Sequence, residues 1–234
     1  TGFAGMSAAA VISPMLITFL HMDAFMAVGI ALSSDVLASA VSAYTYHKTK
    51  NLDVKNGLIM MTFVLMFTVV GSYVASLLPS STMGNFSVFM TLLLGVKFIL
   101  KPVMTTKENM EAVSKKKRIV GSIVCGFICG FVGAGGGMMM LLILTSVLGY
   151  ELKTAVGTSV FIMTFTALTG ATSHFMIKGS PDWLVFSLCV IFTLIWARIA
   201  SLIANKAKPE TLNRAVGVIL IVLSVSVLCF NVLV

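Results

Sequence analysis

Charged residues are scarce in this sequence. Asp, Glu, Lys and Arg make up 10% of the 234 residues, and hydrophobic residues make up 58%, whereas a soluble domain carries roughly 25% charged residues. The mean hydropathy is +1.04. Apolar runs at 57–78, 84–100, 182–204 and 215–234 each approach the roughly 20 residues that cross a bilayer as a helix. The scarcity of charge excludes an ordinary soluble domain and predicts an all-α, polytopic helical membrane protein.

Acidic residues are scarcer than basic ones, with 8 Asp and Glu against 16 Lys and Arg. The basic residues lie in short loops between apolar runs, which is typical of cytoplasmic loops and not of a nucleic-acid surface. We therefore expect a multi-pass protein of the cell membrane, in a prokaryote the plasma or inner membrane. We expect membrane lipid around the protein and no nucleic acid among its partners. Whether it forms a homo-oligomer stays open.

Metal-binding and catalytic patterns are also missing. The four cysteines, Cys125, Cys129, Cys189 and Cys229, lie in apolar segments and show no zinc spacing. The histidines are scattered, and no nucleophile–base pair accompanies them inside an apolar segment. We expect reduced thiols, no metal site, no cofactor and no catalytic residues, so an enzyme is not expected.

The longest polar break divides the chain into two halves of similar size. We predict a first transmembrane repeat at 1–100, a basic cytoplasmic linker at 101–118 and a second transmembrane repeat at 119–234. An offset of 128 places "GFAGMSAAAVISPMLITFLHMDAFMAVG" (2–29) over "GFVGAGGGMMMLLILTSVLGYELKTAVG" (130–157), without gaps. The shared GFxG start and AVG end at one fixed offset indicate a duplication. The counterpart of the start of the second repeat would then precede this sequence.

The orientation of the two repeats depends on how the segment 119–148 runs. As one helix it would be about 45 Å long, too long for a single span. It is either one kinked span or a re-entrant hairpin that enters and leaves on the same side. Full spans in both repeats divide the Lys and Arg residues 11 against 5, whereas hairpins divide them 15 against 1. The positive-inside rule favours hairpins, and hence inverted repeats, each with a broken first helix and three transmembrane helices.

The stretch "GFVGAGGGMMM" (130–140) has neither of the common nucleotide-binding patterns. A dinucleotide fingerprint on Gly133 and Gly135 would need glycine at Met138, and no lysine follows the glycines as a phosphate loop requires. The glycines either allow close helix packing or break a helix so that its backbone amides face an anion. On the second interpretation the substrate-binding residues are Gly133, Gly135, Gly136 and Gly137, with Gly5 and Ser7 in the first repeat.

The stretch "GFVGAGGGMMMLLILTSVLGYELKTAVGTSVFIMTFTALTGATSHFMIKGSPDW" (130–183) resembles the signature of the sulfite exporter TauE/SafE family, also called the toluene-sulfonate uptake permease family. The first half departs from this pattern, because "GMSAAA" replaces the glycine run and "GIALSSD" replaces the Thr-Ser pair. The resemblance implies a permease for a small anion such as sulfite, a sulfonate or a related organic acid anion. It adds Thr158 and Ser159 to the substrate-binding residues.

One acidic residue, Asp35, lies near the centre of an apolar segment, in "GIALSSDVLASAVSAY". An acid at that depth costs roughly 2.5–3.5 kcal/mol, so it usually faces a partner or a cavity. Helical spacing puts Asp35, Ser39, Ser42 and Tyr46 on one stripe, with Ser34 beside it. The stripe either holds two helices together or forms a proton or Na⁺ site made of Asp35, Ser34 and Ser39.

Together these features predict a secondary transporter for a small anion, with its site at the bilayer midplane between two repeats. Coupling to H⁺ or Na⁺ is expected because no ATP-binding motif is present. The alternative is an uncoupled anion channel or a structural membrane component.

Overall fold

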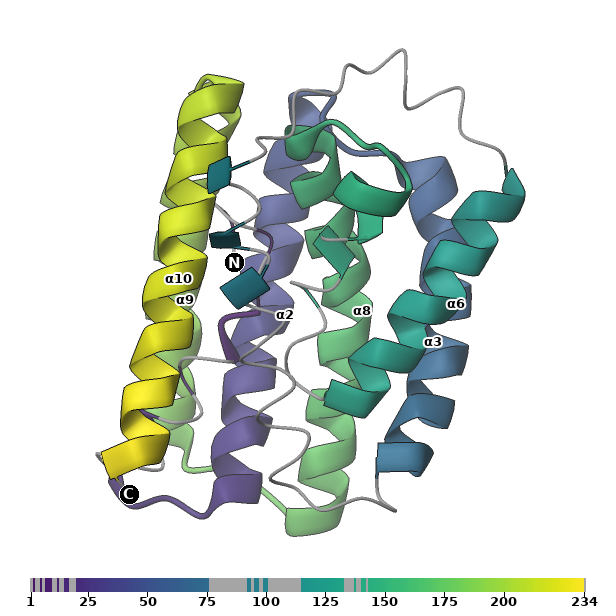
Figure 1. Ribbon diagram of the computed structural model, residues 1–234. Coiled ribbons are helices and arrows are strands. Elements are labelled where there is room, and N and C mark those ends of the chain that lie inside the picture. Colours follow the sequence, from purple (N-terminus) through teal and green to yellow (C-terminus); the bar gives the residue numbers. More distant parts are fainter. Residues whose placement is uncertain are drawn as a thin grey trace.

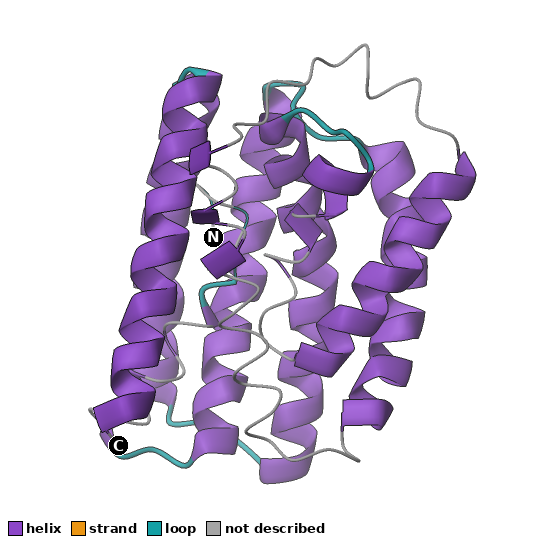
Figure 2. Cartoon of the chain, viewed as in Figure 1, coloured by secondary structure: helices purple, strands orange, loops and turns teal. Residues whose placement is uncertain are grey.

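The computed structural model is all-helical, and no strand occurs among the residues that it describes (Figure 2). The prediction of an all-α protein with several apolar helices is confirmed. The described residues are 2, 5, 7–9, 12, 15–16, 20–75, 92–93, 95–96, 99–100, 115–132, 137, 140–141 and 143–233. Gly133, Gly135 and Gly136 lie outside them, as does most of the predicted linker, and the predicted domain boundaries stay predictions.

Figure 1 labels the helices of the bundle. Their bounds are α2 Ala24–Lys48, α3 Val54–Ala75, α6 Lys115–Val132, the π-helix η1 Ile143–Val147, α8 Leu152–Lys178, α9 Trp183–Lys206 and α10 Pro209–Leu233.

Acidic residues mark the starts of three helices. The Asp23 side chain accepts from Met26 N at 3.2 Å and begins α2, and Asp182 accepts from the first amides of α9 at 2.9 and 3.2 Å. Asp53 accepts from Asn56 N at 3.1 Å and begins α3. A carboxylate at this position satisfies amides that have no partner within the helix and meets the positive end of the helix dipole. Pro209 begins α10, where its missing N–H costs nothing.

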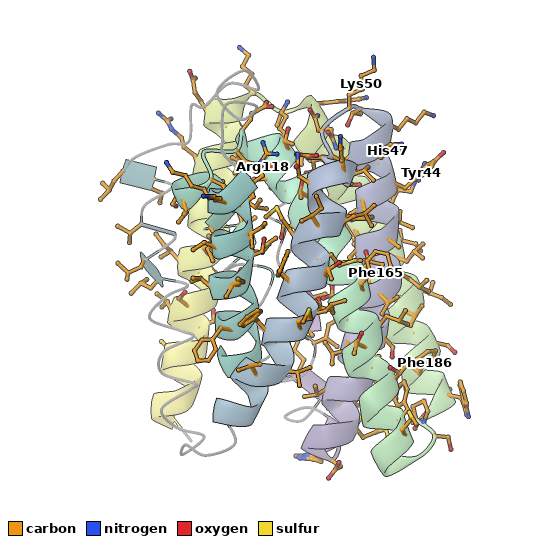
Figure 3. The ribbon with its side chains drawn as sticks, turned by 90° about the vertical axis from the view of Figure 1, so that its right-hand side faces the viewer. Tyr44, His47, Lys50, Arg118, Phe165 and Phe186 are labelled. Carbon is orange, nitrogen blue, oxygen red and sulfur yellow. The ribbon has the colours of Figure 1, made fainter. Side chains whose placement is uncertain are left out.

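The described helices run in two opposite directions (Figure 1). In that view α2 and α9 run upward, whereas α3, α8 and α10 run downward. Helix α2 packs against α8 and α9, and α3 packs against α6. We call the upper end, where α2 and α9 finish and α3, α6, α8 and α10 begin, the basic end. His47, Lys50 and Arg118 lie there in Figure 3. Its Lys and Arg residues are Lys48, Lys50, Lys55, Lys116, Lys117, Arg118, Lys153, Lys206, Lys208 and Arg214.

Helix α6 and the segment that follows it form an antiparallel pair. A β-carbon on Gly121 would lie 3.3 Å from Ile143 and Leu148, and the Sγ of Cys125 is 3.1 Å from the Sδ of Met140. We call the described residues 140–141 and 143–148 the return segment; its late residues meet early residues of α6. The described residues between 140 and 148 therefore run back along α6 toward its start.

The return segment ends in the π-helix η1, where Leu148 N donates to Ile143 O at 3.0 Å. Gly149 then adopts φ +63°, a left-handed conformation that favours glycine. The chain turns there and enters α8, so α6 and α8 both begin at the basic end.

Three helices within the described part of the chain are long and apolar enough to cross a membrane: Met26–Lys48, Leu152–Thr172 and Trp183–Lys206. Helix α9 turns its small residues inward, with Ala197, Ser201 and Ala204 buried. Its large apolar side chains, such as Leu188 and Ile195, are exposed. Large apolar residues outside and small ones at helix contacts are expected of a helix that faces lipid.

The contact between α3 and α6 gives a first prediction. A β-carbon on Gly126 would lie 2.6 Å from the backbone oxygen of Val64, and backbone cannot move aside as a side-chain tip can. We expect Gly126→Ala to destabilise the protein by about 1–3 kcal/mol, the usual cost of overpacking. Thermal unfolding in detergent measures this. Gly121→Ala on the same helix is the control, because only side-chain atoms at 3.3 Å or more surround that position. Equal melting temperatures for the two variants would contradict the close contact between Gly126 of α6 and Val64 of α3.

Candidate functional site

Asp35 lies at the middle of α2 and is completely buried. Its Oδ2 accepts a hydrogen bond from Ser7 Oγ at 2.6 Å, and its Oδ1 accepts one from Ala8 N at 3.1 Å. Ser7 Oγ in turn accepts from Ala9 N at 3.2 Å. The carboxylate therefore lies at the start of the short helical stretch that follows Ser7, where hydroxyl and amide donors stabilise a negative charge.

Ser159 lies between Gly5 of the first half and Gly137 of the second half. Its Oγ lies 3.1 Å from the carbonyl oxygen of Gly5 and 3.1 Å from that of Gly137. Gly5 has φ +64°, a conformation that releases its carbonyl from a helical ladder and that suits glycine. One buried hydroxyl of α8 thus contacts backbone from both halves of the chain.

Gly137 lies against the first break. A β-carbon there would be 2.7 Å from Met163 Sδ, 2.8 Å from Gly5 O and 3.2 Å from Ser7 N. A side chain at this position would displace one of these groups, so Gly137 touches the backbone of Gly5 and Ser7. We call the group formed by Gly5, Ser7, Asp35, Gly137 and Ser159 the crossing.

The predicted stripe on α2 is buried, but its members have different partners. Ser39 Oγ donates to its own helix at Asp35 O (2.5 Å) and accepts from Thr164 Oγ1 of α8 at 3.1 Å. Ser34 Oγ donates to Ile30 O at 3.0 Å. Ser39 thus links α2 to α8 beside Asp35, whereas Ser34 bonds within its own helix.

Thr158 and Ser159 are consecutive, yet they face different elements. Thr158 Oγ1 accepts from Asp53 N at 3.3 Å, at the start of α3 and on the side of the basic end. Ser159 faces the crossing. Neighbours on a helix are about 100° apart, which is why a shared motif does not place both side chains in one site.

Sequence reasoning missed two residues near the crossing. Met163 contacts the position of Gly137, and Thr164 bonds to Ser39. The 128-residue repeat offset points to Met163, because position 163 in the second half corresponds to Asp35 in the first half. The second half therefore has a methionine where the first half has the carboxylate.

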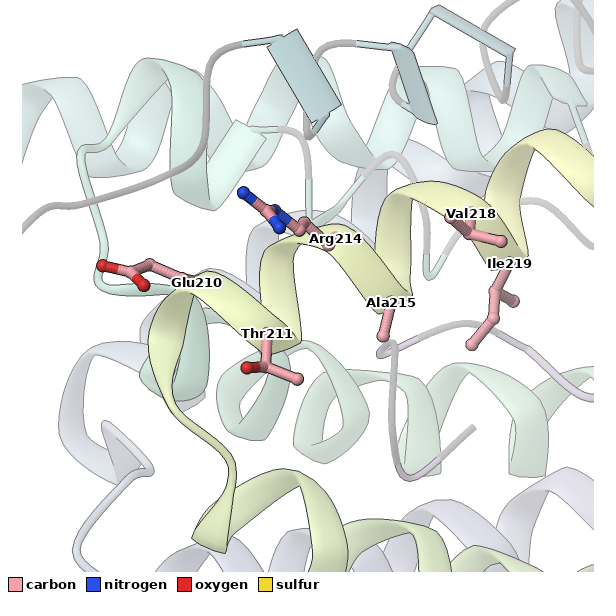
Figure 4. A pocket seen from close by; sticks show the side chains of 6 residues that line it. All are labelled: Glu210, Thr211, Arg214, Ala215, Val218 and Ile219. Atoms are coloured by element: carbon pink, nitrogen blue, oxygen red, sulfur yellow. The ribbon is translucent and has the colours of Figure 1, made fainter.

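A surface cavity of about 640 Å³ lies apart from the crossing, along α10 (Figure 4). Its described lining residues are Glu210, Thr211, Arg214, Ala215, Val218 and Ile219. None of the predicted site residues that the structure describes lines it. Among the described residues, no group of three or more His, Cys, Asp or Glu side chains lies close enough to hold a metal ion.

An apolar helical bundle with broken backbone and a buried carboxylate at its centre is the arrangement of a helical membrane transporter. Comparison with known proteins agrees with this class. The family model "Sulfite exporter TauE/SafE" matches residues 1–227, and the chain belongs to this family.

Three relatives carry the description of a probable membrane transporter protein. YunE of Bacillus subtilis (strain 168) is 26% identical over 214 residues, which cover 84% of this chain and 78% of the relative. YdhB of the same organism is 23% identical over 220 residues, 92% of this chain and 89% of the relative. A protein of Haemophilus influenzae is 26% identical over 166 residues, 68% of this chain and 63% of the relative. No solved structure matches the chain.

The double contact of Ser159 gives a second prediction. Ser159→Ala removes the one hydroxyl proton that lies within reach of two buried carbonyl oxygens, and we expect a loss of about 1–3 kcal/mol of stability. Thermal unfolding in detergent is the measurement. Ser187→Ala is the matched control, because Ser187 is exposed on α9 and bonds only to Trp183 O of its own helix at 2.7 Å. A melting temperature for Ser159→Ala as high as that of the control would show that the crossing does not depend on this hydroxyl.

Proposed function

We propose that this protein is a secondary transporter that carries a small anion through the crossing, coupled to H⁺ or Na⁺ by Asp35. The anion is sulfite, which the family description names, or a sulfonate or a related organosulfur or organic acid anion. The observation that carries the proposal is the crossing itself. Backbone from the two halves of the chain, at Gly5 and Gly137, meets at Ser159 close to the buried carboxylate of Asp35, and exposed backbone groups inside an apolar bundle are tolerated where they serve a solute path.

The helix directions support an inverted repeat. The 128-residue offset makes α2 equivalent to α8 and α3 equivalent to α9. In Figure 1 the members of each pair run in opposite directions. Such repeats let one half rock against the other around a central site, which alternately opens that site to each side. By the positive-inside rule the basic end faces the cytoplasm.

The two halves of the crossing differ in charge, and this supports an anion site on the second half. In the first half, Asp35 already occupies the helix start after Ser7. In the second half, the equivalent Met163 is neutral and lies against Gly137. A substrate anion beside Gly137 would therefore meet a neutral side chain at the position that a carboxylate occupies in the first half.

Asp35 suits a coupling role because its charge holds the first break in place. Ser7 and Ala8 donate to the Asp35 carboxyl oxygens, so a proton or a cation that binds these oxygens competes with those hydrogen bonds and frees Ser7 and Ala8. The carbonyl oxygens of Gly5 and Gly137 lie next to this segment, and unwound carbonyls are common Na⁺ ligands in such transporters. Occupancy of the ion site and the position of the break are therefore linked.

The test of this function is ion-driven uptake into proteoliposomes. With labelled sulfite or sulfoacetate outside, we expect the unmodified protein to accumulate one of them above equilibrium when a proton or Na⁺ gradient is imposed. Asp35→Asn should equilibrate the anion without accumulating it, because the titratable group is gone. Asp182→Asn, an exposed helix cap, is the control. Unchanged accumulation by Asp35→Asn would refute the coupling role, and equilibration without any ion dependence in the unmodified protein would favour the uncoupled channel.

The charge asymmetry gives a prediction on binding. A ligand present at about 100 times its Kd raises stability by roughly 2.7 kcal/mol. Two like charges about 4 Å apart repel by about 4 kcal/mol at an effective dielectric constant of about 20. We therefore expect Met163→Asp to abolish thermal stabilisation by sulfite, sulfate, thiosulfate, taurine or sulfoacetate, whichever stabilises the unmodified protein.

Met163→Leu is the matched control and should keep that stabilisation. Melting temperatures without anion show whether the carboxylate is tolerated in the fold. Retained stabilisation by the anion in a folded Met163→Asp protein would place the anion elsewhere.

A further inference from the structure

Polar side chains join three separate elements at the basic end. The loop between α2 and α3 contacts the end of α9, where Asn205 Oδ1 accepts from Thr49 Oγ1 at 2.7 Å and from Asn51 Nδ2 at 2.8 Å. The first turn of α8 reaches the same place, because Lys153 Nζ donates to Asn205 O at 2.8 Å. The loop is thus held between α8 and α9.

The same loop also bonds to the turn that follows the return segment. Tyr150 OH donates to Asp53 Oδ2 at 2.9 Å, and the Tyr150 ring is completely buried. Burial and then the negative charge of Asp53 raise the pKa of Tyr150, while the positive charge of Arg118 opposes them. The phenol therefore stays protonated at physiological pH and donates to the carboxylate, a hydrogen bond to a charged acceptor.

This loop covers the residues of α8 that lead to the crossing. Asp53 N donates to Thr158 Oγ1 at 3.3 Å, one residue before Ser159. The backbone oxygen of Asn51 lies so close to Gly157 that a β-carbon there would collide with it. Backbone of the loop therefore presses on α8 between the crossing and the basic end.

We propose that the Tyr150–Asp53 contact is a gate that closes the crossing toward the basic end. It joins α3 to the turn between η1 and α8, two elements that must separate if a solute is to pass between Ser159 and that end. This inference rests on the proposed function, because it takes the crossing as the site that the solute occupies. Asp53 also caps α3 by accepting a hydrogen bond from Asn56 N, and this cap does not require Tyr150.

The contact also acts on an anion by charge. While Tyr150 and Asp53 are joined, Asp53 Oδ2 accepts from Tyr150 OH at 2.9 Å as well as from Asn56 Nδ2 at 2.7 Å, and the Asn56 bonds remain when Tyr150 leaves. Once they part, the carboxylate and the nearby Arg118 lie at the entrance with opposite charges. An arriving anion can then take the phenol donor that Asp53 has left, which favours opening when anion is present on that side.

The test measures access to the crossing with a cysteine reporter. Cys125, Cys129, Cys189 and Cys229 are first replaced by serine or alanine, and Ser159→Cys, close in size to serine, is added. Sealed vesicles with the basic end outward receive a membrane-impermeant maleimide, and the rate of labelling is recorded. We expect Tyr150→Phe to label about ten-fold faster, the size of effect expected for loss of one hydrogen bond to a charged group.

Tyr44→Phe is the matched control. Tyr44 lies on α2 near the basic end (Figure 3), but its side chain is 60% exposed. A labelling rate for Tyr150→Phe equal to that of Tyr44→Phe, in protein that melts at the same temperature, would overturn the gate. If Tyr150→Phe does not fold, Asp53→Asn takes its place. Asparagine still caps α3 and weakens the bond from Tyr150, so faster labelling supports the gate and an unchanged rate overturns it.

The labelling rate does not depend on which anion is carried, so the gate and the proposed function can fail separately. Faster labelling together with no uptake of any tested anion would leave the gate standing and remove the transport proposal. Unchanged labelling together with ion-driven uptake would overturn the gate and leave the transport proposal standing. A combined Tyr150→Phe and Asp53→Asn variant should label no faster than the quicker of the two, because both changes remove the same contact.

Discussion

The structure depends on how a broken backbone is satisfied inside an apolar bundle. Amides and carbonyls that leave a helical ladder in such surroundings cost several kcal/mol unless they find a partner. Here Asp35 and Ser7 supply acceptors for the amides of residues 8 and 9, and Ser159 supplies a donor for the carbonyls of Gly5 and Gly137. Three polar side chains on two helices and one loop therefore hold both breaks at the same place.

The same constraint explains where small residues are used. Gly137 has no room for a side chain because the first break lies against it, and Gly157 has none because the α2–α3 loop lies against it. These close approaches bring polar backbone to the centre and to the basic end of the bundle. In contrast, α9 turns large apolar side chains outward and keeps alanine and serine inside. Apolar bulk faces outward, and polar chemistry is confined to a few interior contacts.

Sequence patterns are enough to single out several residues of the crossing. The charge of Asp35 in an apolar run marks that residue, the repeated glycine stretch marks Gly5, Ser7 and Gly137, and the family resemblance marks Ser159. The structure brings these five together. Their neighbours in the chain behave differently, because Thr158 bonds toward α3 and Ser34 bonds within α2. A motif names adjacent residues, but a helix points them about 100° apart, and only packing decides which one faces the centre.

The sequence by itself determined that the chain forms apolar helices, since scarce charge and long apolar runs leave little choice. It also determined the family, through a match along nearly the whole chain. The tertiary structure decided that Ser159 shares its hydroxyl between both halves, that Met163 rather than an acid lies against Gly137, and that Tyr150 meets Asp53. Those contacts join residues 22 to 154 positions apart, and hydrophobic periodicity contains no information about which turn of one helix faces which turn of another.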